Sequence, residues 1–224
     1  MVGPAEKAAF VQLTLVMDAK EKTKRHFNAT AADYNNSGDG KFVQPMNESL
    51  VRELRKLKGG KLLDVGCGNG NLFGLLKEEY HFYGVDLSEN MIAAAKAQYS
   101  DCAALYVADA EKLPFESDMF DVLVCNASFH HYTKPDIVLD EINRVTKSGG
   151  KLLLGDPYMP QPMRWLMNVF TKYSDEGDFH YYGIHEMKHL LEAHGFEIVG
   201  NKHTSHHTVL FIAKKKQEYR KDHM

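Results

Sequence analysis

Cysteine is scarce in this sequence. Only Cys67, Cys102 and Cys125 occur among its 224 residues, and no two of them stand in C-x-x-C spacing. This pattern excludes a disulfide framework and a cysteine-based zinc knot. Reduced thiols of this kind are typical of a cytosolic protein, so we expect a cytoplasmic location.

Neither sign of charge predominates. Lys and Arg number 27 against 30 Asp and Glu, which gives a formal net charge of −3. The one dense basic run spans residues 214–221, and a solvated tail explains it more simply than a binding face. Because a nucleic-acid binder usually carries a cationic face, we expect no nucleic-acid partner.

Long apolar runs are also missing. The stretch "FVQLTLVM" near the N-terminus is too short to span a bilayer. A charged segment followed by an apolar core and a cleavage site does not occur there either, so neither a membrane span nor a secretion signal is expected. Residues 1–16 fit poorly with the rest of the chain, and Met17 is a candidate natural start.

Short apolar runs alternate with helical segments after Gly59 and Gly60. The runs are "KLLDVG", "HFYGVDL", "ALYVADA", "FDVLVCNA", "KLLLGDP", "FEIVG" and "TVLFIAKK". Such alternation predicts right-handed βαβ units, hence a mainly parallel sheet with helices on both faces. Only "NKHTSHH" separates the last two runs, which predicts an antiparallel hairpin at the sheet edge.

A glycine-rich turn follows the first predicted strand. Gly66, Gly68 and Gly70 form G-x-G-x-G, which lets a ligand approach the backbone at a helix N-terminus. Asp86 ends the second predicted strand, where a carboxylate can accept hydrogen bonds from both hydroxyls of a ribose. Together these features predict a nucleotide cofactor.

Two nucleotide cofactors fit this geometry. A dinucleotide fingerprint calls for glycine at position 71, where this chain has Asn71. It also has no use for Asp64 or Asp109. Asp64 can instead meet the cationic amino end of S-adenosylmethionine, and Asp109 can accept from an adenine amino group. The three aspartates at consecutive strand ends favour S-adenosylmethionine.

The motif order resembles that of the class I S-adenosylmethionine-dependent methyltransferases, type 11 group, which includes ubiquinone and menaquinone C-methyltransferases. The resemblance rests on "LLDVGCGNG", "YGVDLSENMI", "VADAEKLPF", "FDVLVCNASFHHY" and "DEINRVTKSGGKLLLGDP" and covers about residues 27–214. It implies an α/β fold, a Rossmann-like doubly wound sheet of seven mostly parallel strands. The implied strand order is 3-2-1-4-5-7-6, with the last strand antiparallel.

The same resemblance implies a set of cofactor contacts. Asp86 would hold the ribose, Asp109 and Ala110 the adenine edge, and Asn126 the methionine moiety, while Tyr34 would close over the cofactor. The full expected set is Tyr34, Asp64, Gly66, Cys67, Gly68, Asp86, Leu87, Met91, Asp109, Ala110 and Asn126. The product would be S-adenosylhomocysteine.

His130 and His131 follow the fourth predicted strand, where the methyl acceptor is expected. An alcohol or phenol acceptor gains from a base, and histidine suits neutral pH. Asp156 ends the adjacent strand and can orient one of them; related O-methyltransferases use a similar His and Asp pair. Methyl transfer itself demands mainly alignment, so a purely structural role for the histidine pair stays open.

Three segments are expected from this pattern: an N-terminal helical cap at 1–48, a methyltransferase domain at 49–214 and a basic tail at 215–224. Residues 159–183 interrupt the domain with the single Trp and several Met and aromatic residues. This insertion is expected to act as a lid over an apolar acceptor pocket. An amphipathic helix packed on the core would also explain Met163, Trp165 and Val169.

We therefore expect an enzyme that methylates an O, N or C atom of a small, aromatic or amphipathic molecule, as a monomer or homodimer. The alternative is a non-catalytic S-adenosylmethionine sensor. "HEMKH", residues 185–189, matches a zinc-protease motif. Its place before the sixth predicted strand and the missing third ligand favour a plain helix, so no metal ion is expected.

Overall fold

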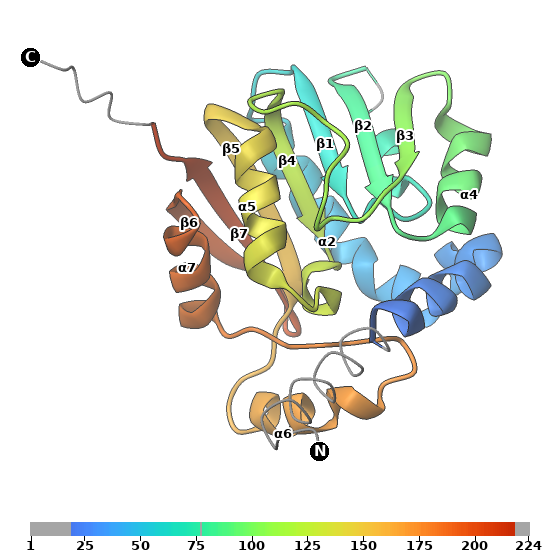
Figure 1. Cartoon of the computed structure of the whole chain (residues 1–224), viewed down its shortest axis with the longest axis vertical. Helices are drawn as coiled ribbons and strands as arrows, with labels where there is room; N and C mark the ends of the chain where they lie inside the picture. Colours follow the sequence, from blue (N-terminus) through green and yellow to red (C-terminus); the bar gives the residue numbers. More distant parts are fainter. Residues whose placement is uncertain (1–18, 77, 218–224) are drawn as a thin grey trace, which may run out of the picture.

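Seven strands form one sheet in the order β3-β2-β1-β4-β5-β7-β6, which confirms the predicted topology (Figure 1). The computed structural model describes residues 19–76 and 78–217, so the segment 1–16, the candidate start at Met17 and the tail beyond residue 217 lie outside the described residues. The strands are β1 (Lys61–Val65), β2 (His81–Asp86), β3 (Ala103–Val107), β4 (Phe120–Asn126), β5 (Thr146–Pro157), β6 (Phe196–Ser205) and β7 (Thr208–Lys215).

The parallel strands point their carboxyl ends to one edge, and β7 runs antiparallel to both β5 and β6. Two boundaries differ from the sequence prediction. β5 begins at Thr146 because this residue pairs with Phe120 before an irregularity in the register. β6 continues to Ser205 because two residues suffice to turn into β7, so the expectation that all of "NKHTSHH" separates these two strands was wrong.

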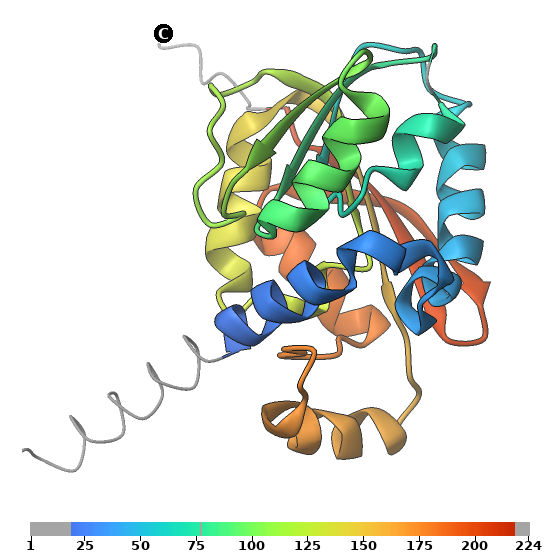
Figure 2. The same cartoon turned by 90° about the vertical axis from the view of Figure 1, so that its right-hand side faces the viewer.

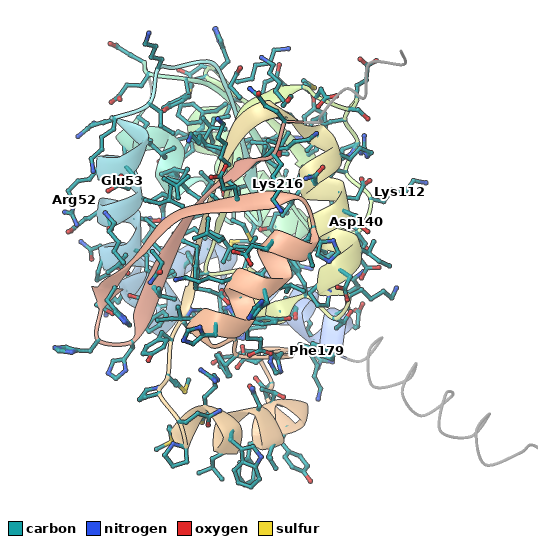
Figure 3. The ribbon with its side chains drawn as sticks, turned by 90° about the vertical axis from the view of Figure 1, so that its left-hand side faces the viewer. Arg52, Glu53, Lys112, Asp140, Phe179 and Lys216 are labelled. Atoms are coloured by element: carbon teal, nitrogen blue, oxygen red, sulfur yellow. The ribbon has the colours of Figure 1, made fainter. Side chains whose placement is uncertain are left out.

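Two apolar clusters sandwich the sheet, because neighbouring residues of a strand point to opposite faces. On one face, Leu63, Leu123 and Leu152 pack beneath α5 (Pro135–Val145) and α7 (Ile184–Ala193). The other face packs beneath α2 (Gly38–Leu54), α3 (Asn71–Leu75) and α4 (Glu89–Tyr99). Figure 3 shows α2, marked by Glu53, and α5, marked by Asp140, on opposite sides.

The N-terminal helices lie across the carboxyl ends of the strands (Figures 1 and 2). Residues 19–30 are helical, and a 3-10 helix, η1 (Ala31–Asn36), leads into α2. α2 continues through the expected boundary at residues 48 and 49, because Leu50 and Leu54 at its end are fully buried against the sheet. Cap and body thus share one helix, and their division stays a prediction.

The insertion after β5 stands away from the sheet. It holds α6 (Met163–Phe170) and the 3-10 helix η3 (Thr171–Tyr173), and α6 buries none of its residues. Trp165 is 64% exposed, and Met163 and Val169 are exposed too, which contradicts the alternative that α6 packs on the core. The loop "YMPQP" carries the chain away from the sheet before α6 begins (Figure 2). No helix among the described residues is long and apolar enough to cross a membrane.

His194 fastens α7 to α5. Its Nδ1 lies 2.7 Å from Asp140 Oδ1 and its Nε2 lies 2.9 Å from Asp136 Oδ1. Partial burial opposes the charged imidazole, but the two carboxylates outweigh it and raise the pKa of His194. The stabilisation is therefore full below the unfolded-state pKa of about 6.5 and fades as pH rises through the higher folded-state pKa.

We expect His194→Ala to lower the free energy of unfolding by about 0.5–1 kcal/mol more at pH 5.5 than at pH 9, since the carboxylates are exposed and screened. Urea denaturation at both pH values measures this difference. An equal loss at both values would show that His194 contributes through packing alone.

Candidate active site

The turn after β1 brings backbone and carboxylate together. Gly66, Gly68 and Gly70 all have positive φ, at 77°, 53° and 83°. The Gly68 N–H donates to Asp86 Oδ2 at 2.8 Å, and the Ser88 N–H donates to Asp86 Oδ1 at 2.9 Å. Burial raises the pKa of Asp86, and these backbone donors oppose the rise. The carboxylate at the end of β2 is thus fixed in orientation.

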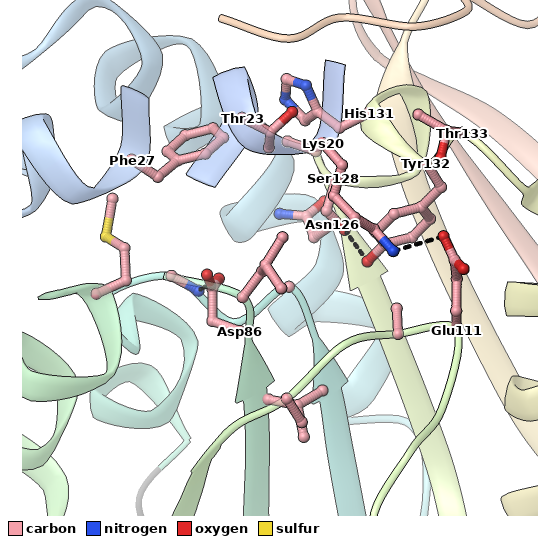
Figure 4. Close-up of a pocket in the computed structure, with 18 of the residues that line it drawn as sticks. Lys20, Thr23, Phe27, Asp86, Glu111, Asn126, Ser128, His131, Tyr132 and Thr133 are labelled. Carbon is pink, nitrogen blue, oxygen red and sulfur yellow. Dashed lines mark hydrogen bonds and ion pairs between the residues drawn. The ribbon is translucent and has the colours of Figure 1, made fainter. Parts of the chain in front are cut away.

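A cavity of about 790 Å³, its open mouth included, lies above this turn (Figure 4). We call it the cofactor cavity. Eight of the eleven residues expected at the cofactor line it: Tyr34, Gly66, Gly68, Asp86, Leu87, Met91, Ala110 and Asn126. The cap helix adds Lys20, Thr23 and Phe27, which carried no motif in the sequence. The structure therefore brings together most of the predicted set.

Asp64 and Cys67 line an adjoining hollow, which also touches Tyr34, Gly66 and Asn126. Asp64 is 5% exposed, and burial together with the charge of Asp86 raises its pKa to about 7. Asp64 Oδ1 and Asn126 Oδ1 are buried oxygens that have no hydrogen-bond partner among the described residues. Buried acceptors of this kind need a donor. The ammonium end of S-adenosylmethionine supplies three N–H donors, so these residues fit that cofactor.

Asp109 lies beside the cofactor cavity but does not line it. Its Oδ2 accepts from Lys20 Nζ at 2.6 Å, and its Oδ1 accepts from the Glu111 N–H at 3.0 Å. Lys20 also reaches Glu111 Oε1 at 2.6 Å (Figure 4). The backbone neighbours Ala108 and Ala110 face the cavity instead. Lys20 escaped the sequence reasoning because 89 residues separate it from Asp109.

A third hollow, of about 860 Å³ with its open mouth, lies between cap and insertion. We call it the acceptor cavity. It shares Phe27, Tyr34, Ala127 and His131 with the cofactor cavity. Its other lining residues are Gly38, Asp39, Phe42, Val43, His130, Pro157, Met159, Glu176, Asp178 and Tyr181. The two cavities therefore meet at His131, and His130 lines only the acceptor cavity.

His130 and His131 occupy a short 3-10 helix, η2 (Phe129–His131), directly after β4. His130 Nδ1 lies 2.8 Å from Asp156 Oδ1, and Asp156 is 1% exposed at the end of β5. Burial opposes a charge on His130, but the Asp156 carboxylate outweighs it and raises the pKa of His130. Burial and the nearby His130 lower the pKa of His131 well below its usual value. The two rings therefore have different protonation behaviour.

The sequence reasoning did not single out Asp39, Glu176, Asp178 or Tyr181. All four line the acceptor cavity, three of them from the insertion. The prediction of a lid over the acceptor named the segment 159–183 but only its apolar character. Its acidic stretch "SDEGD" was the available signal.

"HEMKH" lies at the start of α7, as a plain helix requires. Glu186 accepts from the Gly183 N–H at 3.1 Å and lies 2.8 Å from His180 Nε2, so it caps the helix. His185 and His189 are exposed. Neither belongs to a group of possible metal ligands among the described residues.

Two glycines of the turn make a matched test of steric room. A Cβ on Gly66 would lie 2.6 Å from the Ser128 Cβ, whereas a Cβ on Gly68 would meet nothing within 4 Å. Since both have positive φ, both alanine variants suffer backbone strain, but only Gly66→Ala also overpacks. We expect Gly66→Ala to unfold about 1–3 kcal/mol more easily than Gly68→Ala in denaturant titrations. Equal stabilities would show that the neighbours yield.

The sequence is similar to those of known methyltransferases. A family model described as "Methyltransferase domain" matches residues 63–154. The ubiquinone/menaquinone biosynthesis C-methyltransferase of Paraburkholderia xenovorans is 27% identical over 190 residues, which are 73% of this chain and 76% of that protein. The 27-O-demethylrifamycin SV methyltransferase of Amycolatopsis mediterranei is 34% identical over 118 residues, 50% of this chain and 43% of that protein.

A solved structure agrees as well. The PH0226 protein of Pyrococcus horikoshii superposes with a TM-score of 0.67 at 25% identity, covering 84% of this chain and 95% of that one. The sheet order, the glycine turn, the carboxylates at the strand ends and the relatives are all consistent with an S-adenosylmethionine-dependent methyltransferase. The family match and these relatives support a class I S-adenosylmethionine-dependent methyltransferase of the type 11 group.

Proposed function

We propose that this enzyme methylates an O, N or C atom of a small aromatic or amphipathic molecule bound in the acceptor cavity. The observation that carries the proposal is the junction of the two cavities at Phe27, Tyr34, Ala127 and His131. Bound S-adenosylmethionine supplies an activated methyl group on a sulfonium. Four aromatic side chains and Met159 wall the acceptor side, which suits a flat or amphipathic molecule.

The residues of the chain align the reacting groups, exclude water from them and supply a proton acceptor. We assign Asp86 to the ribose hydroxyls and Asp64 with Asn126 to the amino-acid end of the cofactor. Tyr34 lines all three hollows, so it separates the reacting groups from solvent. Alignment and exclusion of water account for much of the rate in such displacements.

His130 is the proposed proton acceptor. Asp156 fixes its ring through Nδ1, so Nε2 is the nitrogen that would take a proton from the acceptor. His131, which lines both cavities, is placed to position the reacting atom. The family fold alone does not require a base, so these roles rest on the dyad geometry.

The reacting atom stays open between oxygen, nitrogen and carbon. The relatives named above are a C-methyltransferase and a 27-O-demethylrifamycin methyltransferase, at 27% and 34% identity. Their names thus point to different atoms. The cap at 1–48, the lid at 159–183 and the cytoplasmic location likewise remain proposals, as does the absence of a nucleic-acid partner.

Transfer of labelled methyl from S-adenosylmethionine into a fractionated cell extract tests the proposal. Label in the small-molecule fraction supports it and yields the product for mass identification. Label in protein or nucleic acid would contradict the acceptor class. Cofactor binding without transfer to any fraction would favour a non-catalytic sensor.

A further inference from the structure

We propose that the acceptor cavity selects a cationic molecule, an aromatic or amphipathic amine, over neutral and anionic analogues. The inference rests on the proposed function and names the substrate class of the same site. It concerns recognition, and the methylated atom need not be the amine nitrogen.

Three carboxylates face one cavity from two separate segments. Asp39 comes from the first turn of α2, and Glu176 and Asp178 come from the insertion. Among the described residues, no Lys or Arg lines the cavity. The repulsion between these carboxylates is unfavourable when the site is empty, and a bound cation reduces this repulsion. A carboxylate-bearing acceptor would meet repulsion.

The cationic groups near these three carboxylates do not balance their negative charge. His26 Nε2 lies 2.9 Å from Asp39 Oδ2, and His130 Nδ1 is engaged by Asp156. Asp178 lies 3.6 Å from His130 Nε2 and 3.5 Å from His131 Nδ1, too far for good hydrogen bonds. One His130 side chain therefore faces both Asp156 and Asp178, which leaves an excess of negative charge at the cavity wall.

Unpaired buried atoms point independently to a missing donor. His131 is 8% exposed, and its Nδ1 has no hydrogen-bond partner in the part of the chain that the structure describes. Asp178 Oδ1 also lacks one among residues 19–76 and 78–217, although the hydroxyl of Tyr181 donates to Asp178 Oδ2 at 2.8 Å. His130, His131 and Asp178 each bring a potential ligand atom within 4.8 Å of the other two. An ammonium group brings N–H donors to this cluster.

Aromatic rings complete the site. Phe27, Tyr34, Phe42 and Tyr181 line the same cavity, and the ring of Tyr181 stacks on His130 with centroids 5.6 Å apart. Aromatic faces attract cations, and they also bind the apolar part of an arylalkylamine. Charge and shape therefore favour one class of ligand.

Calorimetry with the full chain saturated with S-adenosylhomocysteine tests the inference. The probes are phenethylamine, 2-phenylethanol and phenylacetate, which share a ring but differ in charge. EDTA is present throughout, so that a divalent ion cannot take the place of the ammonium. We expect phenethylamine to bind at least ~10-fold more tightly than the alcohol, with phenylacetate weakest, and the preference to shrink at high salt.

Matched variants locate the effect. Asp178→Asn and Glu176→Gln should each lower phenethylamine affinity about 5-fold and leave 2-phenylethanol unaffected. Asp175→Asn is the control, because Asp175 is an exposed neighbour that does not line the cavity. Melting temperatures check that each variant folds.

Equal binding of amine and alcohol, no detectable amine binding, or equal losses in Asp175→Asn and Asp178→Asn would overturn the inference. Each of these outcomes leaves S-adenosylhomocysteine binding intact and so spares the proposed function. Failure of the chain to bind S-adenosylhomocysteine or to release any methyl group would instead count against the proposed function.

Discussion

Replacement of Asp86 by alanine is expected to weaken S-adenosylmethionine binding at least ~100-fold. A carboxylate that accepts hydrogen bonds from both ribose hydroxyls contributes about 1.5–3 kcal/mol per bond when it is shielded from water. Asp86 is suited to this role, because burial raises the pKa of its carboxyl group and Gly68 and Ser88 hold both oxygens in place at the cavity wall. Calorimetric titration with S-adenosylmethionine measures the loss.

Two further variants serve as controls for this prediction. Asp86→Asn keeps one acceptor oxygen for the turn, so it separates lost binding from a disordered loop. Asp109→Ala is the contrast, since Lys20 already occupies that carboxylate, and we expect a loss of less than ~10-fold. Near-normal affinity of Asp86→Ala, with its melting temperature preserved, would disprove the ribose assignment.

His130→Ala is expected to lower kcat about 100-fold to 1,000-fold with little change in cofactor affinity. The reason is geometric: His130 lines the acceptor cavity and not the cofactor cavity. Rapid-quench or steady-state rates, paired with calorimetry, separate the two effects. A variant that retains more than half of its kcat would reduce His130 to a structural residue.

The pH profile supplies an independent check. Because Asp156 raises the pKa of His130, its neutral, proton-accepting form accumulates above the ordinary value of about 6.5. We expect kcat/KM of the wild type to rise with pH through that higher pKa. Asp156→Asn removes the carboxylate, so the rise should move to lower pH as the maximum falls. An unmoved profile would mean that another group titrates.

Local patterns carried most of the fold. Each strand run begins within two residues of its predicted start except β5, because apolar alternation and Gly-rich turns are local properties of the chain. Gly66, Gly68 and Asp86 were predictable for the same reason, since the ends of consecutive parallel strands meet at one edge. Thr146 joined β5 through its partner Phe120, which no local pattern encodes.

The acceptor side was much less predictable. Asp39 and Asp178 are far apart in the sequence and meet only because α2 and the insertion fold over the same cavity. Trp165 looked like a core residue by its chemistry, yet the loop before α6 places it 64% exposed. The hydrophobic periodicity of a sequence does not encode contacts between side chains from two distant loops.

The contact of Lys20 with Asp109 and Glu111 has a consequence for turnover. It joins the N-terminal helix to the segment after β3 at the wall of the cofactor cavity, which Lys20 and Glu111 both line. Parting of the N-terminal helix from this segment would break these ion pairs, so we expect their lifetime to contribute to how long cofactor and product stay bound. Such a latch weakens as ionic strength rises. Higher salt is thus expected to speed the exchange of cofactor and product. It is also expected to weaken the binding of a cationic acceptor, so it favours one step of the catalytic cycle and hinders another.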